Sequence, residues 1–196
     1  MNRFRKLQIF GISLVAVGTL GLLPLQYFRM QSDLALADAP VVNVPAVAPN
    51  PAPQAISGTP SRIVIPSVGI DIPVLEGAYD TKTGSWTLSN TAAHYALPST
   101  LPNDTSGNTL IYGHYNKSVF SRLPKVQPGA EARVETVEGY VFVYRFVSAE
   151  TVAPADTSVF TYSGPPRLTL QTCVGTFFQD RRLHYFEFDR VEKPRI

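Results

Sequence analysis

Residues 61–196 alternate between short runs of branched, apolar and aromatic residues and clusters of turn-forming residues, and this spacing constrains the fold more than any other feature. Runs of this kind, bounded by Gly, Pro, Asn, Asp or Ser, predict β-strands. The strands predicted in this way are Arg62–Ile65, Ile70–Val74, Gly84–Leu88, Asn108–Tyr112, Ala132–Thr136, Tyr140–Val147, Arg167–Cys173 and Leu183–Val191. Many short strands with frequent turns are typical of an all-β barrel or sandwich.

One short helical turn interrupts this pattern, and we expect it at Val119–Leu123, with Pro124 ending it. The segment 61–196 is long enough to form one domain with its own core. The chain is 44% hydrophobic and 16% charged, and its formal net charge is only +2. Because the sequence contains no basic stripe, we expect no nucleic-acid partner.

A run without charged residues extends from Leu7 to Tyr27, directly after the basic segment Met1–Lys6. As a helix this run would be about 31 Å long, close to the ~30 Å thickness of a bilayer core. The basic flank predicts a cytoplasmic amino terminus and an extracellular remainder. We therefore expect residues 1–30 to form a cytoplasmic tag and a single-pass anchor in the cell membrane.

A cleavable signal peptide is the alternative interpretation of this segment. Ala35-Leu36-Ala37 and Ala37-Asp38-Ala39 both have the small-x-small pattern that a signal peptidase recognises. The apolar run is longer than a usual signal core, and both sites lie well beyond its end. These two features favour a retained anchor, and both interpretations export the rest of the chain.

Residues 31–60 are rich in proline, alanine and valine and show neither helical nor strand periodicity. This composition is typical of a semi-extended polyproline linker, which at ~3.1 Å per residue would reach about 90 Å. The alternative is a disordered spacer of no particular length.

Cys173 is the only cysteine of the chain and ends the predicted strand Arg167–Cys173. Side chains alternate along a strand, so Leu168, Leu170 and Thr172 share the face expected to seek the core, and Cys173 faces the other way. A thiol at the end of a strand is a candidate nucleophile, although many free cysteines are simply small buried hydrophobes. A lone thiol outside the membrane is at risk of oxidation, which favours a functional role.

Three histidines are present, and the position of His114 is the one that suits proton transfer. His114 directly follows an apolar strand, and Gly113 before it allows the backbone to bend or approach another segment. A structural histidine is the alternative interpretation. We expect His94 in a surface or substrate-side loop and His184 in a packing or rim position. No pair of histidines or carboxylates has metal-ligand spacing, so we predict no metal site and no cofactor.

Several of these segments together resemble the sortases, the cysteine transpeptidases of the Gram-positive cell surface. Leu168–Cys173, followed by Arg182-Leu183, resembles the family's cysteine and arginine signature, and Tyr112-Gly113-His114 resembles its histidine motif. Two further stretches are similar to the family's first strands and to the segment after the histidine: 63–74 and 121–129.

The resemblance implies an eight-stranded sortase-type β-barrel over residues 61–196, preceded by a transmembrane helix. It also implies Cys173 as the nucleophile, His114 as the general acid and base and Arg182 as the catalytic cation, with Thr172 and Arg181 binding substrate. Arg181 is the alternative to Arg182, because a shift of one residue in the alignment exchanges them. The implied partners are surface proteins with a C-terminal sorting signal and an amine acceptor, either a cell-wall precursor peptide or a pilin lysine.

The sequence departs from parts of the family pattern. Tyr115 follows the histidine where many sortases have arginine. No Asp-Pro-aromatic lid precedes the barrel and no second hydrophobic segment follows it, which favours a single-anchor, housekeeping-like enzyme near classes E or F. The stretch Leu97–Thr100 looks like part of a sorting signal, but it has neither the following glycine nor the hydrophobic and basic tail.

Three other functions remain open at this point. An L,D-transpeptidase also pairs cysteine with histidine on a β-rich fold, but a Ser-x-Gly-Cys-x-Arg run is expected there, whereas Gln171-Thr172 precedes this cysteine. A non-enzymatic wall or ligand-binding β-domain needs no catalytic residues. A catalytically inactive sortase fold would bind peptides without cleaving them.

Overall fold

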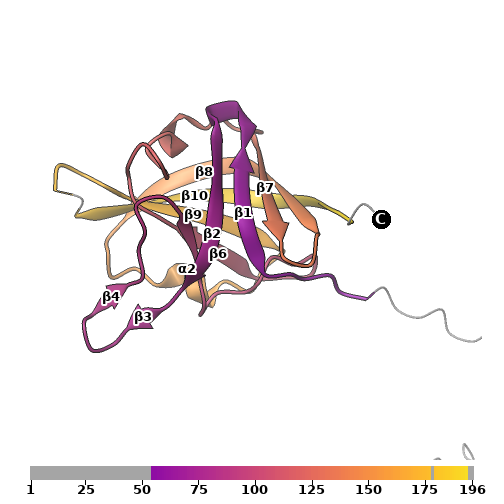
Figure 1. Cartoon of the computed structure of the whole chain (residues 1–196), viewed down its shortest axis with the longest axis horizontal. Coiled ribbons are helices and arrows are strands. Elements are labelled where there is room, and N and C mark those ends of the chain that lie inside the picture. The colour runs from indigo at the N-terminus through magenta and orange to yellow at the C-terminus, as the bar shows by residue number, and fades with distance from the viewer. Residues whose placement is uncertain (1–53, 178, 194–196) are drawn as a thin grey trace, which may run out of the picture. The chain divides into compact units, whose positions relative to one another are not determined.

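Eight strands close into a barrel, and two further short strands form a separate hairpin (Figure 1). The computed structural model describes residues 54–177 and 179–193. The barrel strands are β1 (Pro60–Ile65), β2 (Ile70–Gly77), β5 (Ala93–Ala96), β6 (Asn108–Tyr112), β7 (Glu131–Thr136), β8 (Val141–Val152), β9 (Arg167–Val174) and β10 (Asp180–Glu192). Their order around the barrel is β1-β2-β5-β6-β9-β10-β8-β7. The closed barrel confirms the all-β, eight-stranded part of the predicted fold.

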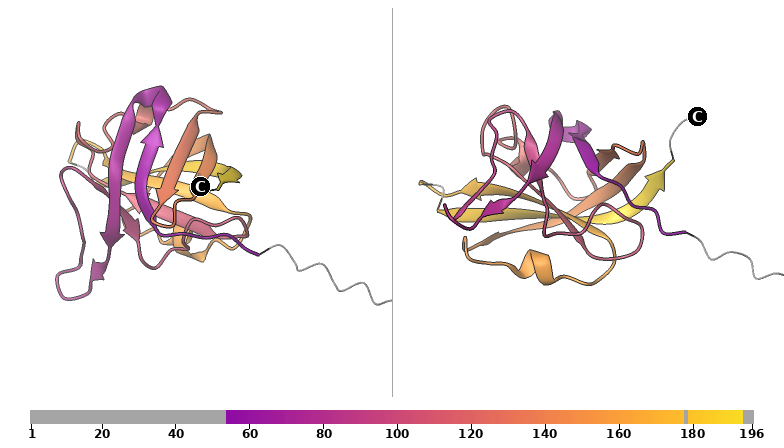
Figure 2. Two further views of the ribbon diagram at one scale, coloured as in Figure 1. Left: turned by 45° about the vertical axis from the view of Figure 1, so that its right-hand side comes forward. Right: turned by 60° about the horizontal axis from the view of Figure 1, so that its bottom comes forward.

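The remaining elements are short and lie in the connections between barrel strands. The hairpin consists of β3 (Tyr79–Asp80) and β4 (Ser85–Trp86), and it projects outward from the barrel (Figure 1). Two 3₁₀ turns, η1 (Pro66–Val68) and η2 (Leu123–Lys125), lie in other connections. The helical turn α2 (Ser158–Thr161) lies in the connection from β8 to β9, on the outside of the barrel (Figure 2).

Three local predictions differ from the structure. The strand predicted at Gly84–Leu88 is only the two-residue β4, which pairs with β3 outside the barrel. The barrel strand β5 was not predicted, because its four residues are all buried and show no alternation of polar and apolar side chains. The helical turn expected at Val119–Leu123 forms later, as η2, with Pro124 inside it.

Parallel pairing between β6 and β9 brings two chain segments together at one end of the barrel. The paired residues run from Asn108 opposite Arg167 to Tyr112 opposite Gln171. Because parallel strands run in the same direction, the residues that follow Tyr112 lie beside the residues that follow Gln171, which continue β9 to Val174. Strand β10 pairs antiparallel with the other side of β9.

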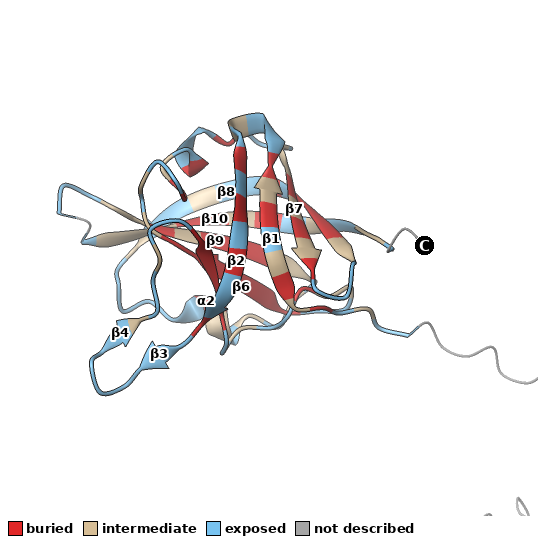
Figure 3. Ribbon diagram, viewed as in Figure 1, coloured by how far each residue is buried: buried red, intermediate tan, exposed pale blue. Residues whose placement is uncertain are grey.

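Buried residues occur along the barrel strands (Figure 3), and the apolar ones form two clusters, one inside the barrel and one on part of its outside. Strand β1 shows the alternation expected of a one-sided strand, with Ile63 and Ile65 buried inside the barrel. Strand β6 is buried at all five positions, because a second apolar cluster lies on its outer face. That cluster is made of Ala96, Leu110, Tyr112, Val159 and Leu183, packed against side chains that include Trp86 and Phe160.

Part of the predicted linker belongs to the barrel. The backbone N–H of Ile56 donates to Asp104 Oδ1 at 2.9 Å, the N–H of Gly58 donates to the carbonyl of Pro102 at 3.1 Å, and β1 begins at Pro60. The predicted anchor and the linker up to residue 53 lie outside the described residues. Within the described residues, no helix has the length and apolar character needed to cross a bilayer.

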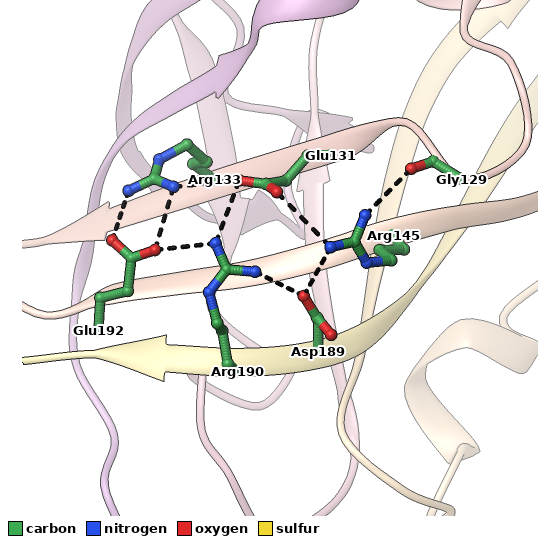
Figure 4. Close-up of polar contacts among 7 residues, drawn as sticks. All are labelled: Gly129, Glu131, Arg133, Arg145, Asp189, Arg190 and Glu192. Atoms are coloured by element: carbon green, nitrogen blue, oxygen red, sulfur yellow. Dashed lines mark hydrogen bonds and ion pairs between the residues drawn. The ribbon is translucent and has the colours of Figure 1, made fainter.

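A network of ion pairs joins β7, β8 and β10 on the outside of the barrel (Figure 4). Arg133 of β7 contacts Glu192 of β10 at 2.6 Å, and Arg190 contacts the same carboxylate at 2.9 Å. Arg145 of β8 contacts Asp189 at 3.1 Å. The hydrogen bond from Arg133 is the main reason that the pKa of Glu192 is lowered.

Glu192 therefore contributes to stability only while it is ionised. A carboxyl group whose pKa is lowered by folding contributes above its ordinary pKa of about 4.3, and the contribution is lost as the pH falls through the lowered value. We expect Glu192→Gln to reduce the unfolding free energy at pH 7 by less than about 1 kcal/mol, because the pair is partly exposed. Denaturant unfolding between pH 7 and pH 3 should show a weaker loss of stability on acidification in the variant than in the wild type.

The matched control is Glu187→Gln, also on β10, because Glu187 makes no ion pair within the part of the chain that the structure describes. An equal effect of both substitutions, or a steeper acid dependence in Glu192→Gln, would contradict the role given to the network.

Candidate active site

A cleft of about 740 Å³ lies on the outer face of the barrel, over the ends of β6 and β9. Its floor includes Tyr112 of β6 and Gln171 and Cys173 of β9. The β3–β4 hairpin contributes Trp86 to its walls, and the segment from the end of β8 through α2 contributes Phe160. The cleft is therefore the part of the outer face that these two segments do not cover.

Cys173 of β9 lies between the segment after β6, which carries His114, and β10, which carries Arg181, and all three residues line the cleft. On the β6 side, the N–H of Gly113 donates to the carbonyl of Gln171 at 3.1 Å, so the parallel pairing continues past the end of β6 and His114 follows beside Cys173. On the β10 side, Arg181 is the direct antiparallel partner of Cys173. Directly opposed residues of an antiparallel pair share one face of the sheet.

Close packing against Gly113 fixes the backbone that carries His114. A Cβ atom at position 113 would lie 2.6 Å from Cγ1 of Val119, so only glycine fits there without a shift. The carbonyl of His114 accepts a hydrogen bond from the N–H of Phe120 at 3.1 Å, and Val119 and Phe120 are both fully buried. The turn after β6 is thereby held against the barrel core.

The outward orientation predicted for Cys173 is confirmed. Leu168 and Leu170 are fully buried in the barrel core, whereas Cys173 is half-buried and lines the cleft. It is therefore not one of the buried structural cysteines that were the alternative interpretation.

Thr172, which was predicted to bind substrate, contributes to the lining of the cleft, but its side chain is turned away from the face that carries Cys173. Thr172 is 1% exposed, and its hydroxyl donates to the carbonyl of Gly113 at 3.0 Å. The physical reason is the two-residue period of the strand, which turns Thr172 away from the face that carries Cys173. Thr172 instead ties the end of β9 to the backbone next to His114.

The two adjacent arginines occupy the opposite positions from those that the family pattern implies. Arg182 is paired with Thr172, on the face opposite to Cys173, and its Nη1 donates to Thr151 Oγ1 at 3.0 Å. Arg181 lines the cleft, and Arg182 does not. Arg181 Nη1 also donates to the carbonyl of Asp180 at 3.2 Å.

The other two histidines are buried and do not line the cleft. The expectation that His94 lies in a surface loop is wrong, because it belongs to β5, is 3% exposed and donates from Nδ1 to the carbonyl of Glu76 at 3.2 Å. His184 packs beside Phe146 as expected, with ring centroids 6.0 Å apart, and burial lowers its pKa to about 4. Only His114, of the three histidines, is placed to exchange protons in the cleft.

An aromatic cluster in the lining of the cleft was not predicted. The ring of Trp86 is stacked on Phe160 with centroids 6.0 Å apart, and it makes an edge-to-face contact with the ring of Tyr112 with centroids 5.2 Å apart. Trp86 therefore connects the hairpin wall to the α2 wall. The sequence signal was a single tryptophan between polar residues, Ser85 and Thr87, in a segment too short for a barrel strand.

The arrangement suits acyl transfer through a cysteine. A thiolate is the nucleophilic form of cysteine, and neighbouring cations favour it. Imidazole can exchange protons with the attacking and leaving groups, and a guanidinium can stabilise an oxyanion. Among the residues that the structure describes, no three potential metal ligands lie close together.

Comparisons with protein-family models and with solved structures both find similar proteins. The model of the Sortase domain family matches residues 63–185. Similar solved structures include Listeria monocytogenes sortase A (TM-score 0.56, 22% identity, covering 70% of this chain and 92% of that one). The sortase E1 of Streptomyces coelicolor, solved with a tripeptide in its active site, has a TM-score of 0.55 at 22% identity and covers 69% and 90% of the two chains. Sortase C of Streptococcus pneumoniae has a TM-score of 0.58 at 20% identity and covers 72% and 73%. No curated protein matches the chain.

The hydrogen bond from Thr172 to Gly113 has a measurable consequence for stability. We expect Thr172→Val, which keeps the shape but removes the donor, to lower the unfolding free energy by about 1–2 kcal/mol, because the buried carbonyl of Gly113 loses this donor. Thr172→Ser keeps the hydroxyl and should cost clearly less. Denaturant unfolding of the three proteins tests this, and equal stability of the valine variant and the wild type would contradict it.

Proposed function

The chain belongs to the sortase family and is a cysteine transpeptidase, and on this premise we propose that Cys173 is the nucleophile, His114 the general acid and base, and Arg181 the cation that stabilises the reaction's negative charge. One observation carries the assignment: Cys173 lies on the cleft floor between the strand end that leads to His114 and the strand position occupied by Arg181. The matched family segment, residues 63–185, includes all three residues.

The first half of the proposed reaction forms a thioester. The Cys173 thiolate attacks the carbonyl carbon of the threonine in a Leu-Pro-x-Thr-Gly-like peptide, and a C–S bond forms as the carbonyl electrons move to oxygen. The guanidinium of Arg181 and a backbone N–H near Cys173 stabilise this oxyanion. The oxyanion then collapses, the Thr–Gly C–N bond breaks, and protonated His114 donates its proton to the departing amine.

The second half transfers the acyl group to an amine. Neutral His114 accepts a proton from the incoming amine as its nitrogen attacks the thioester carbonyl carbon. The C–S bond breaks and the thiolate of Cys173 is restored, together with a protonated His114. Attack by an amine gives transpeptidation, and attack by water gives hydrolysis of the same thioester.

The proposed substrates are surface proteins with a C-terminal sorting signal, and the proposed acceptor is an amine of a cell-wall precursor peptide or a pilin lysine. The uncharged run Leu7–Tyr27 after basic residues supports a single-pass membrane anchor with the barrel outside the cell. The missing Asp-Pro-aromatic lid supports a housekeeping-like enzyme near classes E or F. Membership of the sortase family replaces the L,D-transpeptidase and non-enzymatic interpretations.

Removal of the thiol tests the proposed nucleophile. We expect Cys173→Ala to abolish cleavage of a fluorogenic Leu-Pro-x-Thr-Gly peptide, because no thioester can form without the sulfur atom. Mass spectrometry of the wild-type protein mixed with the peptide should detect the acyl adduct on Cys173. Cleavage by the alanine variant, or binding of the peptide by the wild type without any turnover, would contradict the proposal; the latter outcome is expected of an inactive sortase fold.

The two arginines provide a matched pair of variants. We expect Arg181→Gln to lower kcat by about 10²–10³, the range found when one oxyanion donor is removed. Arg182→Gln should lower kcat by less than about tenfold, because Arg182 faces away from the cleft and contacts Thr151. Steady-state kinetics with the same peptide would overturn the assignment if Arg182→Gln proved the more damaging change.

A further inference from the structure

Two outward-facing side chains of β9 are accessible from the cleft, and only one of them belongs to the proposed reaction. Side chains alternate, so Thr169, Gln171 and Cys173 share the outer face. Thr169 is 0% exposed, and its hydroxyl donates to Asn108 Oδ1 at 2.6 Å, so it is closed off from the cleft. Gln171 and Cys173 both line the cleft.

Hydrogen bonds hold the backbone of Gln171 in the sheet, whereas its side-chain carboxamide is available to a ligand. Its carbonyl accepts the N–H of Gly113, and the residue lies between Tyr112 of β6 and Leu183 of β10. Within the described residues, its side chain makes no hydrogen bond. The floor around it is apolar and includes Leu110 and Tyr112. Any ligand that covers this carboxamide must supply hydrogen bonds in place of water, because an unpaired buried amide opposes binding.

An extended peptide can supply these hydrogen bonds at the right distance from the thiol. Two residues of a strand span about 6.6 Å, and an extended ligand has the same spacing. We consider an extended peptide whose scissile carbonyl lies at Cys173 and whose preceding residues run toward Trp86 and Phe160. The main chain of this peptide lies beside Gln171 at the residue two positions before the scissile bond.

We propose that Gln171 is a substrate-positioning residue, whose carboxamide donates to the peptide's main-chain carbonyl two residues before the scissile one and so sets the register of the peptide on Cys173. In a Leu-Pro-x-Thr-Gly peptide this carbonyl belongs to proline, which has no N–H of its own and presents only an acceptor. The proposal rests on the proposed function and adds to it a main-chain contact that does not depend on side-chain identity.

The test combines a protein variant with an altered substrate. Gln171→Met keeps the length of the side chain and removes the carboxamide. Replacement of the amide between proline and x by an ester weakens the proline carbonyl as an acceptor without changing any side chain. We expect each change alone to lower kcat/KM by about tenfold, mainly through KM, because the contact is present in both the bound substrate and the transition state. We expect the two changes together to cost little more than either one.

Binding without turnover gives a second readout. The single tryptophan of the chain, Trp86, lines the same cleft, so its fluorescence can follow peptide binding to the Cys173→Ala protein. We expect Gln171→Met in this background to raise Kd by about tenfold. The control is Gln127→Met, the same substitution at an exposed glutamine outside the cleft, which should change neither Kd nor kcat/KM.

Two outcomes overturn the inference, and they are distinguishable from each other. If the wild type cleaves the peptide and Gln171→Met has an unchanged kcat/KM, Gln171 does not position the substrate, and the proposed function stands. The same conclusion follows if the loss in kcat/KM from Gln171→Met and the loss from the ester peptide multiply when the two changes are combined. A wild-type protein that does not cleave the parent peptide would remove the proposed function and this inference with it. The ester peptide tests the contact in the wild type, so the conclusion does not depend on how well the variant folds.

Discussion

The hydrogen bonds between the parallel strands β6 and β9 are the interaction on which the site depends. Strand β6 ends one residue before Gly113 and β9 ends one residue after Cys173, so their pairing brings two segments that are far apart in the chain to one edge. The pairing continues beyond β6 through two contacts of Gly113, which donates to Gln171 and accepts from Thr172. These contacts leave little freedom to the backbone that carries His114.

The site also depends on the outer face of the barrel being only partly covered by other segments. Strand β6 is buried on both faces, because α2 and the β3–β4 hairpin pack on its outer side with apolar residues. The cover is interrupted over Gln171 and Cys173, which leaves a cleft with a rigid floor of two hydrogen-bonded strands. Its walls are short connections that meet through the stacked rings of Trp86 and Phe160. Hydrogen-bonded strands therefore position the proposed reacting groups, while connections, which vary more easily, shape the cleft proposed for the substrate.

Strand phase explains which site residues could be predicted from the sequence. The phase of β9 follows from Leu168 and Leu170, so the outward position of Cys173 was correctly predicted, and the same alternation turns Thr172 inward. The phase of β10 at its start does not follow from the sequence, because Arg181 and Arg182 are adjacent and chemically identical. Only the register between β9 and β10 shows that Arg181 lies opposite Cys173.

By itself, the sequence determined the all-β class, most of the barrel strands, the outward thiol and the histidine beside a glycine, because these depend on local alternation and on turn residues. The tertiary structure decided which arginine faces the cleft, that His94 is buried, and that Trp86 of the hairpin stacks on Phe160 of α2. Strand register, crossover connections and contacts between distant segments decide these features. They are set by the closure of the whole barrel, and no local stretch of sequence contains them.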